Sequence, residues 1–169
     1  LFFAMILNAQ NTQVQFINNS ADSLMRSVKV VFNGDLKKDS LAYRKATPFI
    51  STAGDSTYTI EFQSKINATK TVSITQTLQA GKKYVLVLNG VTNDSSFVKN
   101  PDSISTQLTI VFIDQSAIAT PASNQVALAF VNGSTDAPSF DLYSNDTLNT
   151  LLADNDSLNQ FLPVTLEDT

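Results

Sequence analysis

The sequence predicts an all-β protein: an antiparallel sandwich of two sheets, of the immunoglobulin or transthyretin kind, with about seven strands. Its acidic residues are thirteen Asp and only two Glu, and Asp, Asn, Ser and Thr favour turns over helices because their short side chains hydrogen-bond the nearby backbone. Apolar and polar residues alternate along much of the chain, which is typical of strands. Apolar residues make up 43% and charged residues 15%, which indicates a packed core rather than a disordered chain.

The first two predicted strands share one pattern. Val14 and Phe16 alternate with polar residues, and the same alternation returns over residues 28–32. Asn33 and Gly34 follow, and this pair tolerates the positive φ angles of a tight hairpin turn.

Four further segments complete the predicted sandwich. Residues 57–62 and 72–78 alternate in the same way, and residues 84–88 are apolar throughout, which indicates a central strand. A long exposed loop is expected over residues 89–103, and residues 108–113 close the set. Short strands at this density suit two packed sheets, with a closed barrel as the alternative. The expected core contains seven large apolar side chains: Phe16, Val30, Ile60, Phe62, Ile74, Leu86 and Phe112.

The opening pattern of the chain then returns. Matching residues lie at a spacing of 114 (130 − 16) and, after a short gap, of 112 (140 − 28): Phe16/Phe130, Asn18/Asn132, Ser20/Ser134 and Asp22/Asp136, then Val28/Phe140, Val30/Leu142, Asn33/Asn145 and Phe49/Phe161. We therefore expect residues 12–115 to form one sandwich, residues 116–124 a linker, and residues 125–169 the first strands of a second, truncated copy.

The second copy is expected to contain strands at residues 125–132, 139–144 and 160–164. Three such strands are not expected to be stable by themselves. Their apolar residues Phe130, Phe140, Leu142 and Phe161 must therefore stay exposed or pack on the first unit.

The first ten residues, LFFAMILNAQ, predict a location. Their apolar run is too short to span a bilayer and fits the end of a secretory signal peptide, so residues 1–10 are interpreted as its remnant; a buried first strand is the alternative. The formal net charge is −4 and the lysines are scattered, which argues against a nucleic-acid partner. A secreted or cell-surface protein without a transmembrane segment is expected.

The segment NGSTDAPSFDLYSND (residues 132–146) carries a family resemblance. Ser134, Asp136 and Pro138 form a loop motif, and residues 140–143 form the strand that follows. The segment resembles the signature of a secreted bacterial family catalogued as domain of unknown function 4397. Its members show a His-Ala-Ser-Pro-Asp-Ala-Pro-like loop before a Val-Asp-Val-Tyr-like strand.

The earlier copy keeps Asn18, Ser20, Asp22, Val30 and Asn33-Gly34 of this pattern, whereas Asn18 and Asn132 stand where the family often has His. The resemblance implies a secreted bacterial β-sandwich, often in tandem, with no established activity.

A structural role is expected for the motif residues. An Asp two residues after a Ser can accept backbone N–H bonds in a tight loop, and Pro138 fixes φ before the next strand. This interpretation covers both copies, with ligand binding as the alternative: Ser20, Asp22, Ser134, Asp136 and Pro138.

Several chemistries lack their residues in this sequence. It contains no Cys and no His, so thiol catalysis, Ser-His-Asp catalysis and His- or Cys-ligated zinc are excluded within it. Carboxylate pairs could be drawn from the Asp residues, and Ca²⁺ could use residues 154–156 or 93–94, but neither segment has a spaced ligand series, so polar turns are expected. We expect no catalytic residue, cofactor or metal.

Tyr43 is the candidate ligand-binding residue. Sugar-binding surfaces use exposed aromatic rings, and there is no Trp, while Tyr58 and Tyr143 fall on strands and are expected at the edge of the core. Tyr43 lies in a loop-like segment and could contact an extracellular glycan or protein, with packing as the alternative.

A further motif resembles a modification signal. Asp followed by Ser or Thr and then by an aliphatic residue or Thr recurs, as in the O-glycosylation signal of secreted Bacteroidetes proteins. Chance turn pairs are the alternative. The candidate positions are Ser23, Ser40, Ser56, Ser103, Thr147 and Ser157.

Two functions follow from these features. The first is a non-enzymatic secreted or cell-surface module in a tandem array, with an adhesion, display or spacer role. The second is a module that binds a glycan or protein through its inter-strand loops.

Overall fold

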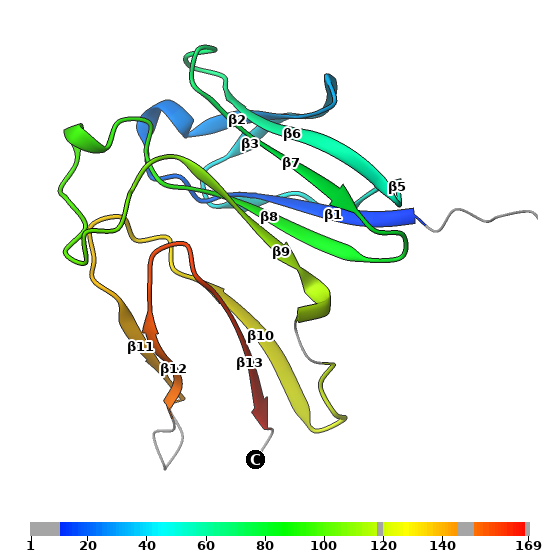
Figure 1. Cartoon of the computed structure of the whole chain (residues 1–169), viewed down its shortest axis with the longest axis vertical. Helices are drawn as coiled ribbons and strands as arrows, with labels where there is room; N and C mark the ends of the chain where they lie inside the picture. Colours follow the sequence, from blue (N-terminus) through cyan, green and yellow to red (C-terminus); the bar gives the residue numbers. More distant parts are fainter. Residues whose placement is uncertain (1–10, 118–119, 145–150, 168–169) are drawn as a thin grey trace, which may run out of the picture.

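The computed structural model of the chain describes residues 11–117, 120–144 and 151–167. The predicted fold class is confirmed: two sheets pack face to face in an all-β sandwich, and two further two-stranded sheets lie below it (Figure 1). The predicted signal remnant at residues 1–10 lies outside the described residues.

One sheet of the sandwich, sheet A, has five strands, in the order β4-β1-β8-β9 with β5 also paired to β1. Sheet B has four strands in the order β3-β2-β6-β7. The strands of sheet A are β1 (Asn11–Asn18), β4 (Lys45–Ala46), β5 (Ile50–Ala53), β8 (Lys83–Asn89) and β9 (Thr109–Asp114). Those of sheet B are β2 (Ser27–Phe32), β3 (Asp35–Ala42), β6 (Ser56–Ser64) and β7 (Thr71–Leu78). Three 3-10 turns complete this part: η1 (Ser23–Met25), η2 (Asp94–Ser96) and η3 (Gln115–Ala117).

One strand pair of the sandwich runs parallel. β1 and β8 point the same way, with Phe16 opposite Leu86, whereas every other pair among the described strands is antiparallel. β8 therefore lies between β1 and β9, in the central position that its continuous apolar sequence predicts.

The predicted tight turn joins β2 to β3. Asn33 has φ of 45° and Gly34 has φ of 88°, and both belong to the left-handed region. The strand after it, β3, has the polar sequence DLKKDSLA and did not show the expected alternation, yet it pairs with β2 throughout. Its lysines and its irregular register are devices that protect an exposed sheet edge from further pairing.

The core lies between sheets A and B, as predicted. Phe16, Val30, Ile60, Phe62 and Leu86 are all 0–1% exposed. The Phe16 ring meets Phe32 and Phe62 edge to face, at centroid distances of 5.4 and 5.9 Å. Two predicted core residues are only half-buried, and pack against the cluster from its margin: Ile74 and Phe112. Met25 of η1, which alternation alone could not identify, is fully buried.

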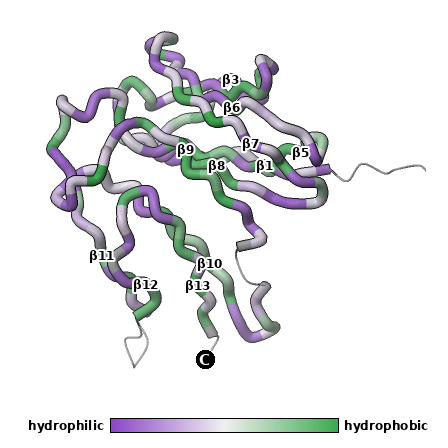
Figure 2. Tube along the Cα trace, in the orientation of Figure 1, coloured by the Kyte–Doolittle hydropathy of each residue, from purple (hydrophilic) through white to green (hydrophobic). Residues whose placement is uncertain are grey.

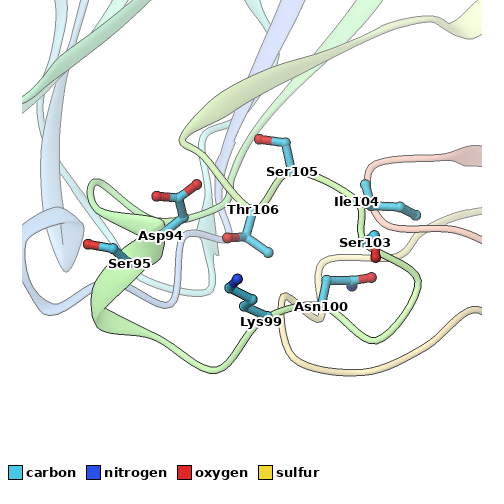
Figure 3. A pocket seen from close by; sticks show the side chains of 8 residues that line it. All are labelled: Asp94, Ser95, Lys99, Asn100, Ser103, Ile104, Ser105 and Thr106. Atoms are coloured by element: carbon cyan, nitrogen blue, oxygen red, sulfur yellow. The ribbon is translucent and has the colours of Figure 1, made fainter.

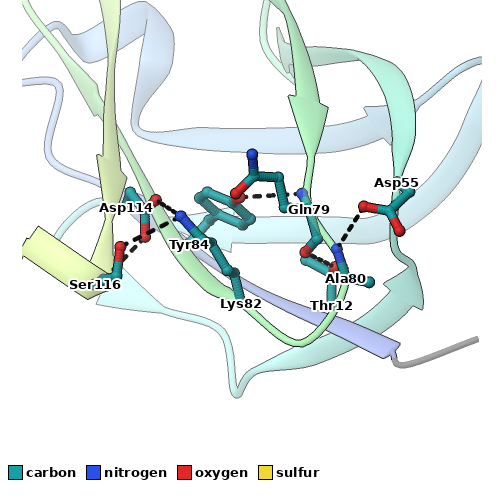
Figure 4. Close-up of polar contacts among 8 residues, drawn as sticks. All are labelled: Thr12, Asp55, Gln79, Ala80, Lys82, Tyr84, Asp114 and Ser116. Carbon is teal, nitrogen blue, oxygen red and sulfur yellow. Dashed lines mark hydrogen bonds and ion pairs between the residues drawn. The ribbon is translucent and has the colours of Figure 1, made fainter.

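Polar contacts fasten the end of the sandwich at which β1 begins (Figure 4). The Thr12 hydroxyl donates to the Gln79 carbonyl at 2.5 Å, and the Gln79 N–H donates to the Tyr84 hydroxyl at 3.1 Å. Lys82 Nζ lies 2.8 Å from Asp114 Oδ2, and this contact raises the pKa of Lys82. Short loops at this end are thereby tied to both sheets.

A two-stranded sheet of β10 (Gln125–Val131) and β13 (Phe161–Glu167) touches the outer face of sheet A with one end. Val131 and Phe161 pack against Val85, Val87 and Ile113 of β8 and β9, which are at most 9% exposed. β8, whose hydrophobic colour is visible in Figure 2, is therefore apolar on both faces: Leu86 packs in the core between the sheets, and Val85 and Val87 pack in this outer cluster.

The other two-stranded sheet is a hairpin of β11 (Phe140–Tyr143) and β12 (Leu151–Asp156). The strands predicted at residues 125–132, 139–144 and 160–164 are confirmed as β10, β11 and β13, whereas β12 was not predicted. The apolar residues of this segment were expected either to stay exposed or to pack on the first unit, and both occur. Phe161 packs on sheet A, while Phe140 is 41% exposed. Tyr143, expected at a core edge, is 48% exposed.

Candidate functional site

Loops from both parts of the chain meet at the end of the sandwich where β1 finishes. They are the segment after β1, the turn between β3 and β4, and the loop between β10 and β11. Together they line a pocket of about 380 Å³. Its lining residues are Asn19, Ala21, Tyr43, Arg44, Gly133, Ser134, Thr135 and Asp136.

Asn18, at the end of β1, anchors the first loop. Its side chain is fully buried, and Nδ2 donates to the carbonyls of Met25 at 2.8 Å and Leu41 at 3.1 Å. Its Oδ1 accepts from the Ser20 N–H at 3.3 Å. The buried amide therefore holds η1, β3 and the loop in one arrangement, and a Leu of similar size could not make these bonds.

Ser20 and Asp22 tie this loop to the segment after β8. The Ser20 hydroxyl donates to the Gly90 carbonyl at 2.7 Å. Asp22 Oδ2 accepts from the Thr92 N–H at 2.8 Å and from its hydroxyl at 2.6 Å, and Oδ1 accepts from Leu24 N. Burial by itself raises the pKa of the Asp22 carboxyl, but these hydrogen bonds outweigh burial and hold the pKa below its ordinary value.

The loop after β10 repeats the same anchor. Asn132 is 2% exposed; its Nδ2 donates to the Asp156 carbonyl at 2.8 Å, and its Oδ1 accepts from Ser134 N at 3.0 Å. The backbone bonds recur as well: Arg44 N donates to Asn18 O at 2.7 Å, and Asn159 N donates to Asn132 O at 2.8 Å. Arg44 and Asn159 also share positive φ angles of 57° and 67°. Asn18 and Asn132, which are related by the spacing of 114, thus make matching contacts.

Asn89, the last residue of β8, joins the two loops. It is fully buried; its Nδ2 lies 2.9 Å from Asn159 Oδ1 and 3.3 Å from the Asn132 carbonyl, and its Oδ1 accepts from Asn19 Nδ2 at 2.8 Å. Gly133 lies against this group, and a Cβ there would approach Asn19 Nδ2 to 2.0 Å. We call Asn19, Asn89, Asn132 and Asn159 the asparagine junction.

A second set of bonds links the loop between β8 and β9 to the loop between β10 and β11. Asn100 Nδ2 donates to the Ala137 carbonyl at 2.9 Å, and Asp102 Oδ2 accepts from the N–H and the hydroxyl of Ser139, both at 2.6 Å. The Ser139 hydroxyl bond holds the pKa of Asp102 below its ordinary value. The long loop is therefore fastened to both parts of the chain.

A comparison with protein families decides where this arrangement belongs. A family described as "Domain of unknown function (DUF4397)" matches residues 12–143, which run from β1 through β11. The chain belongs to the DUF4397 family. No curated protein matches the chain. The match extends past the boundary expected at residues 115–116. It includes the first loop, the motif of the second loop, and Asn19, Asn89 and Asn132 of the asparagine junction.

The motif residues of this DUF4397 chain differ between the two loops. Ser20 and Asp22 are at most 4% exposed and have all their contacts within the protein. Ser134 and Asp136 are exposed, joined by one long bond of 3.4 Å, and line the pocket, while Pro138 is exposed outside it. The contacts of the first loop are those that a structural role requires.

Tyr43, the predicted ligand-binding residue, lies in the pocket that both DUF4397 loops line. It is 36% exposed, its N–H donates to Arg26 O at 2.9 Å, and the Arg44 guanidinium lies 5.2 Å from the centre of its ring. An aromatic face, a cation and the Asp136 carboxylate thus border one opening. This set suits a polar ligand with hydroxyl groups.

A second pocket, of about 430 Å³, is lined entirely by the loop between β8 and β9 (Figure 3). It contains Asp94 and Lys99 but no aromatic ring. Of the sequence-predicted site residues, it contains only Ser103, which has a positive φ of 60°. The pocket with Tyr43 is therefore the stronger candidate site.

The candidate glycosylation residues differ in accessibility. Ser23, Ser40 and Ser103 are exposed, whereas Ser56 and Ser157 are half-buried. Ser56 donates to the Gly54 carbonyl at 3.2 Å, and the hydroxyls of Ser157 and Ser139 lie 3.3 Å apart. Thr147 lies outside the described residues.

Asp156 is the residue whose position sequence reasoning missed. Residues 154–156 were expected to form a polar turn, but they belong to β12, because Asp156 pairs with Phe140. Its carboxylate is buried and neither oxygen has a hydrogen-bond partner among the described residues, and burial raises its pKa. Asn132 Nδ2 donates to the Asp156 carbonyl as Asn18 Nδ2 donates to that of Leu41, and Asp156 pairs with Phe140 as Leu41 pairs with Val28. Asp156 therefore stands where the first unit has a core leucine, although the spacing of these two residues, 115 (156 − 41), differs from both repeat spacings of the sequence.

Within the described part of the chain, no three His, Cys, Asp or Glu side chains gather closely enough to hold a metal ion. Across the same residues, no helix has the length and apolar character needed to cross a membrane.

Proposed function

We propose that this DUF4397 chain is a non-enzymatic, secreted or cell-surface bacterial module, arranged in tandem, that holds neighbouring units at a fixed angle. Its role is that of a spacer or display element, with adhesion as a consequence of display. The observation that carries the proposal is the asparagine junction, in which a fully buried side chain of the sandwich bonds the first loop and the next unit together.

The apolar part of the same contact supports a tandem arrangement. The cluster on the outer face of sheet A contains Ile17 and Phe49 from the first unit, and Val131 and Phe161 from the next. These residues correspond at the repeat spacings of 114 and 112, so equivalent positions of the two units meet each other. A contact with both apolar packing and satisfied buried amides resists bending more than a flexible linker does.

A distance measurement tests the fixed angle. The chain contains no Cys, so Asp35→Cys with Thr165→Cys gives a unique pair of spin labels, one on each unit. We expect a narrow distribution of distances. Asn89→Ala should broaden it, because the bonds to both loops are lost, whereas Asn93→Ala in the exposed loop should leave it unchanged. A broad distribution in the unmodified junction would contradict the proposal.

A second function is favoured by the pocket with Tyr43. There a half-exposed ring, a guanidinium and the second loop lie together, which supports binding of an extracellular glycan or protein segment. Tyr43→Ala should abolish a signal on a glycan array, while Tyr143→Ala, which removes an exposed ring outside the pocket, should retain it. If both variants behave alike, Tyr43 has no special role.

Export and modification belong to the same proposal. Protein from the native host should begin near Gln10 or Asn11, as N-terminal sequencing would detect. Mass spectrometry should find glycans first at Ser23, Ser40 and Ser103, whose side chains are exposed. A soluble mature chain that retains residues 1–7 would exclude the signal interpretation.

A further inference from the structure

One edge of β10 has no neighbour among the described strands. β10 pairs with β13 in a regular antiparallel register, and no other described strand joins it. The Asn159 N–H donates to the Asn132 carbonyl, so the backbone groups of Asn132 face the β13 side of β10. Since alternate residues of a strand direct their backbone groups to opposite edges, Leu128 and Phe130 also face β13. The backbone groups of Ala127, Ala129 and Val131 therefore face the open edge.

β1 shows what occupies the matching edge in the first unit. The Arg44 N–H bonds the Asn18 carbonyl on one side of β1, as Asn159 does for β10. On the other side, Gln13 N donates to Lys82 O at 3.0 Å and Asn19 N donates to Leu88 O at 2.9 Å, so β8 pairs there in parallel. Adding 114 to Gln13, Gln15 and Ile17 gives the three residues at the open edge of β10.

The open edge carries none of the features that protect a sheet edge. The sequence of β10, QVALAFV, has no charge and no proline, and its register is continuous. The exposed edge strand β3, by contrast, has two lysines and an irregular register. Sheet edges that are left without charge, proline or bulge are ready to pair with another strand.

We propose that the open edge of β10 accepts a parallel strand with the chemistry of β8, a tyrosine followed by a continuous apolar run. This inference rests on the proposed tandem arrangement. The expected register follows β1 and β8: Leu128 lies opposite a tyrosine equivalent to Tyr84, and Phe130 opposite a leucine equivalent to Leu86. Main-chain bonds supply the affinity, and the apolar side chains of the added strand select the partner.

A peptide tests the acceptor edge directly. The probe is the segment KKYVLVLNG (residues 82–90), added to the full chain and followed by residue-resolved amide hydrogen exchange. We expect exchange at Ala127, Ala129 and Val131 to slow by about tenfold or more, because their N–H groups gain partners. Leu128 and Phe130, which already face β13, should change little. A scrambled peptide of the same composition should have no effect.

A matched pair of variants separates edge pairing from general stabilisation. Ala129→Pro removes one open-edge N–H, which edge strands tolerate, and should abolish the protection while the circular dichroism spectrum stays native. Ala129→Ser keeps the N–H and should retain the protection. If Ala129→Pro unfolds the β10–β13 pair, the comparison of the two peptides on Ala129→Ser still shows whether the edge accepts a strand.

Three outcomes would overturn the inference. They are an absence of protection, equal protection by the scrambled peptide, and protection that rises with protein concentration without peptide, which would mean that two copies pair through β10. The spin-label distances report on the junction separately. A narrow distribution together with absent protection would reject the acceptor edge and leave the fixed angle standing.

Discussion

Asp22 and Asp136 hold matching positions of the family loop but differ in what surrounds them. Asp22 accepts bonds from Thr92 and Leu24, while Asp136 is exposed with a single bond of 3.4 Å. Asp22→Ala should lower the free energy of unfolding by about 1–3 kcal/mol, because it leaves buried donors without partners. Asp136→Ala, the matched control, should stay within about 0.5 kcal/mol. Urea unfolding measures both, and equal effects would contradict the difference in role.

The lowered pKa of Asp22 also sets the sign of its pH dependence. The folded state binds the proton less readily than the unfolded state, so the contribution of Asp22 is present above the unfolded pKa of 3.8. It is lost as the pH falls through the folded pKa. The penalty of Asp22→Ala should therefore shrink in acid, and a penalty that grows in acid would refute this account.

The contribution of Asp156 to stability depends on pH with the opposite sign. Its buried carboxylate has no partner and its pKa is raised, so the folded state binds the proton more readily. Stability should fall as the pH rises from the unfolded pKa through the folded one. Asp156→Leu, which restores the residue found at Leu41, should raise the free energy of unfolding at neutral pH by about 1–3 kcal/mol. This gain should diminish in acid; a destabilised variant at neutral pH would mean that the carboxylate has a partner in solution.

At the scale of elements, β8 has two faces with different layers against them. Leu86 points into the core between the sheets and is fully buried, so Leu86→Ala should cost about 2–5 kcal/mol in denaturant unfolding. Leu36, on the exposed edge strand β3, is 54% exposed, and Leu36→Ala should change stability by less than about 0.5 kcal/mol. Comparable costs would contradict the assignment of β8 to the core.

The elements also show what a sequence can reveal. Alternation located β1, β2, β6 and β7, and the continuous apolar run placed β8 at the centre, because burial of one or two faces leaves a direct mark on residue choice. β3 and β12 show no such alternation. β3 is held by its turn and by its pairing with β2, and β12 ends in a buried Asp where an apolar residue would be expected. The parallel pairing of β1 with β8 and the asparagine junction depend on contacts between distant residues, which local patterns do not encode. Of the site, the loop motifs and Tyr43 could be identified in advance, but not their meeting in one pocket.

For the whole molecule, the outer face of sheet A links the stability of the two units. The sequence predicts one sandwich over residues 12–115, and Val131 and Phe161 of the segment that follows it pack against Val85, Val87 and Ile113. Removal of residues 125–169 should therefore lower the melting temperature of the remaining sandwich, since each newly exposed aliphatic side chain can forfeit up to about 1.5–3 kcal/mol of burial. Phe161→Ser in the full chain should act in the same direction. Calorimetry that finds the shortened chain unchanged would show that the contact adds no stability.

The parallel pairing of β1 with β8 has a consequence for the order in which the chain acquires structure. Phe16 meets Leu86, seventy positions later (86 − 16), so the first strand to be synthesised finds β4 and β5 early but its parallel neighbour β8 only after most of the sandwich exists. At about 5–20 residues per second, a ribosome needs roughly 4–14 s to cover that interval. Such long-range pairing also slows refolding, into the range of milliseconds to seconds typical of all-β domains. During this interval Val14 and Phe16, which β1 buries in the core, lack their neighbours in β8 and stay open to other partners.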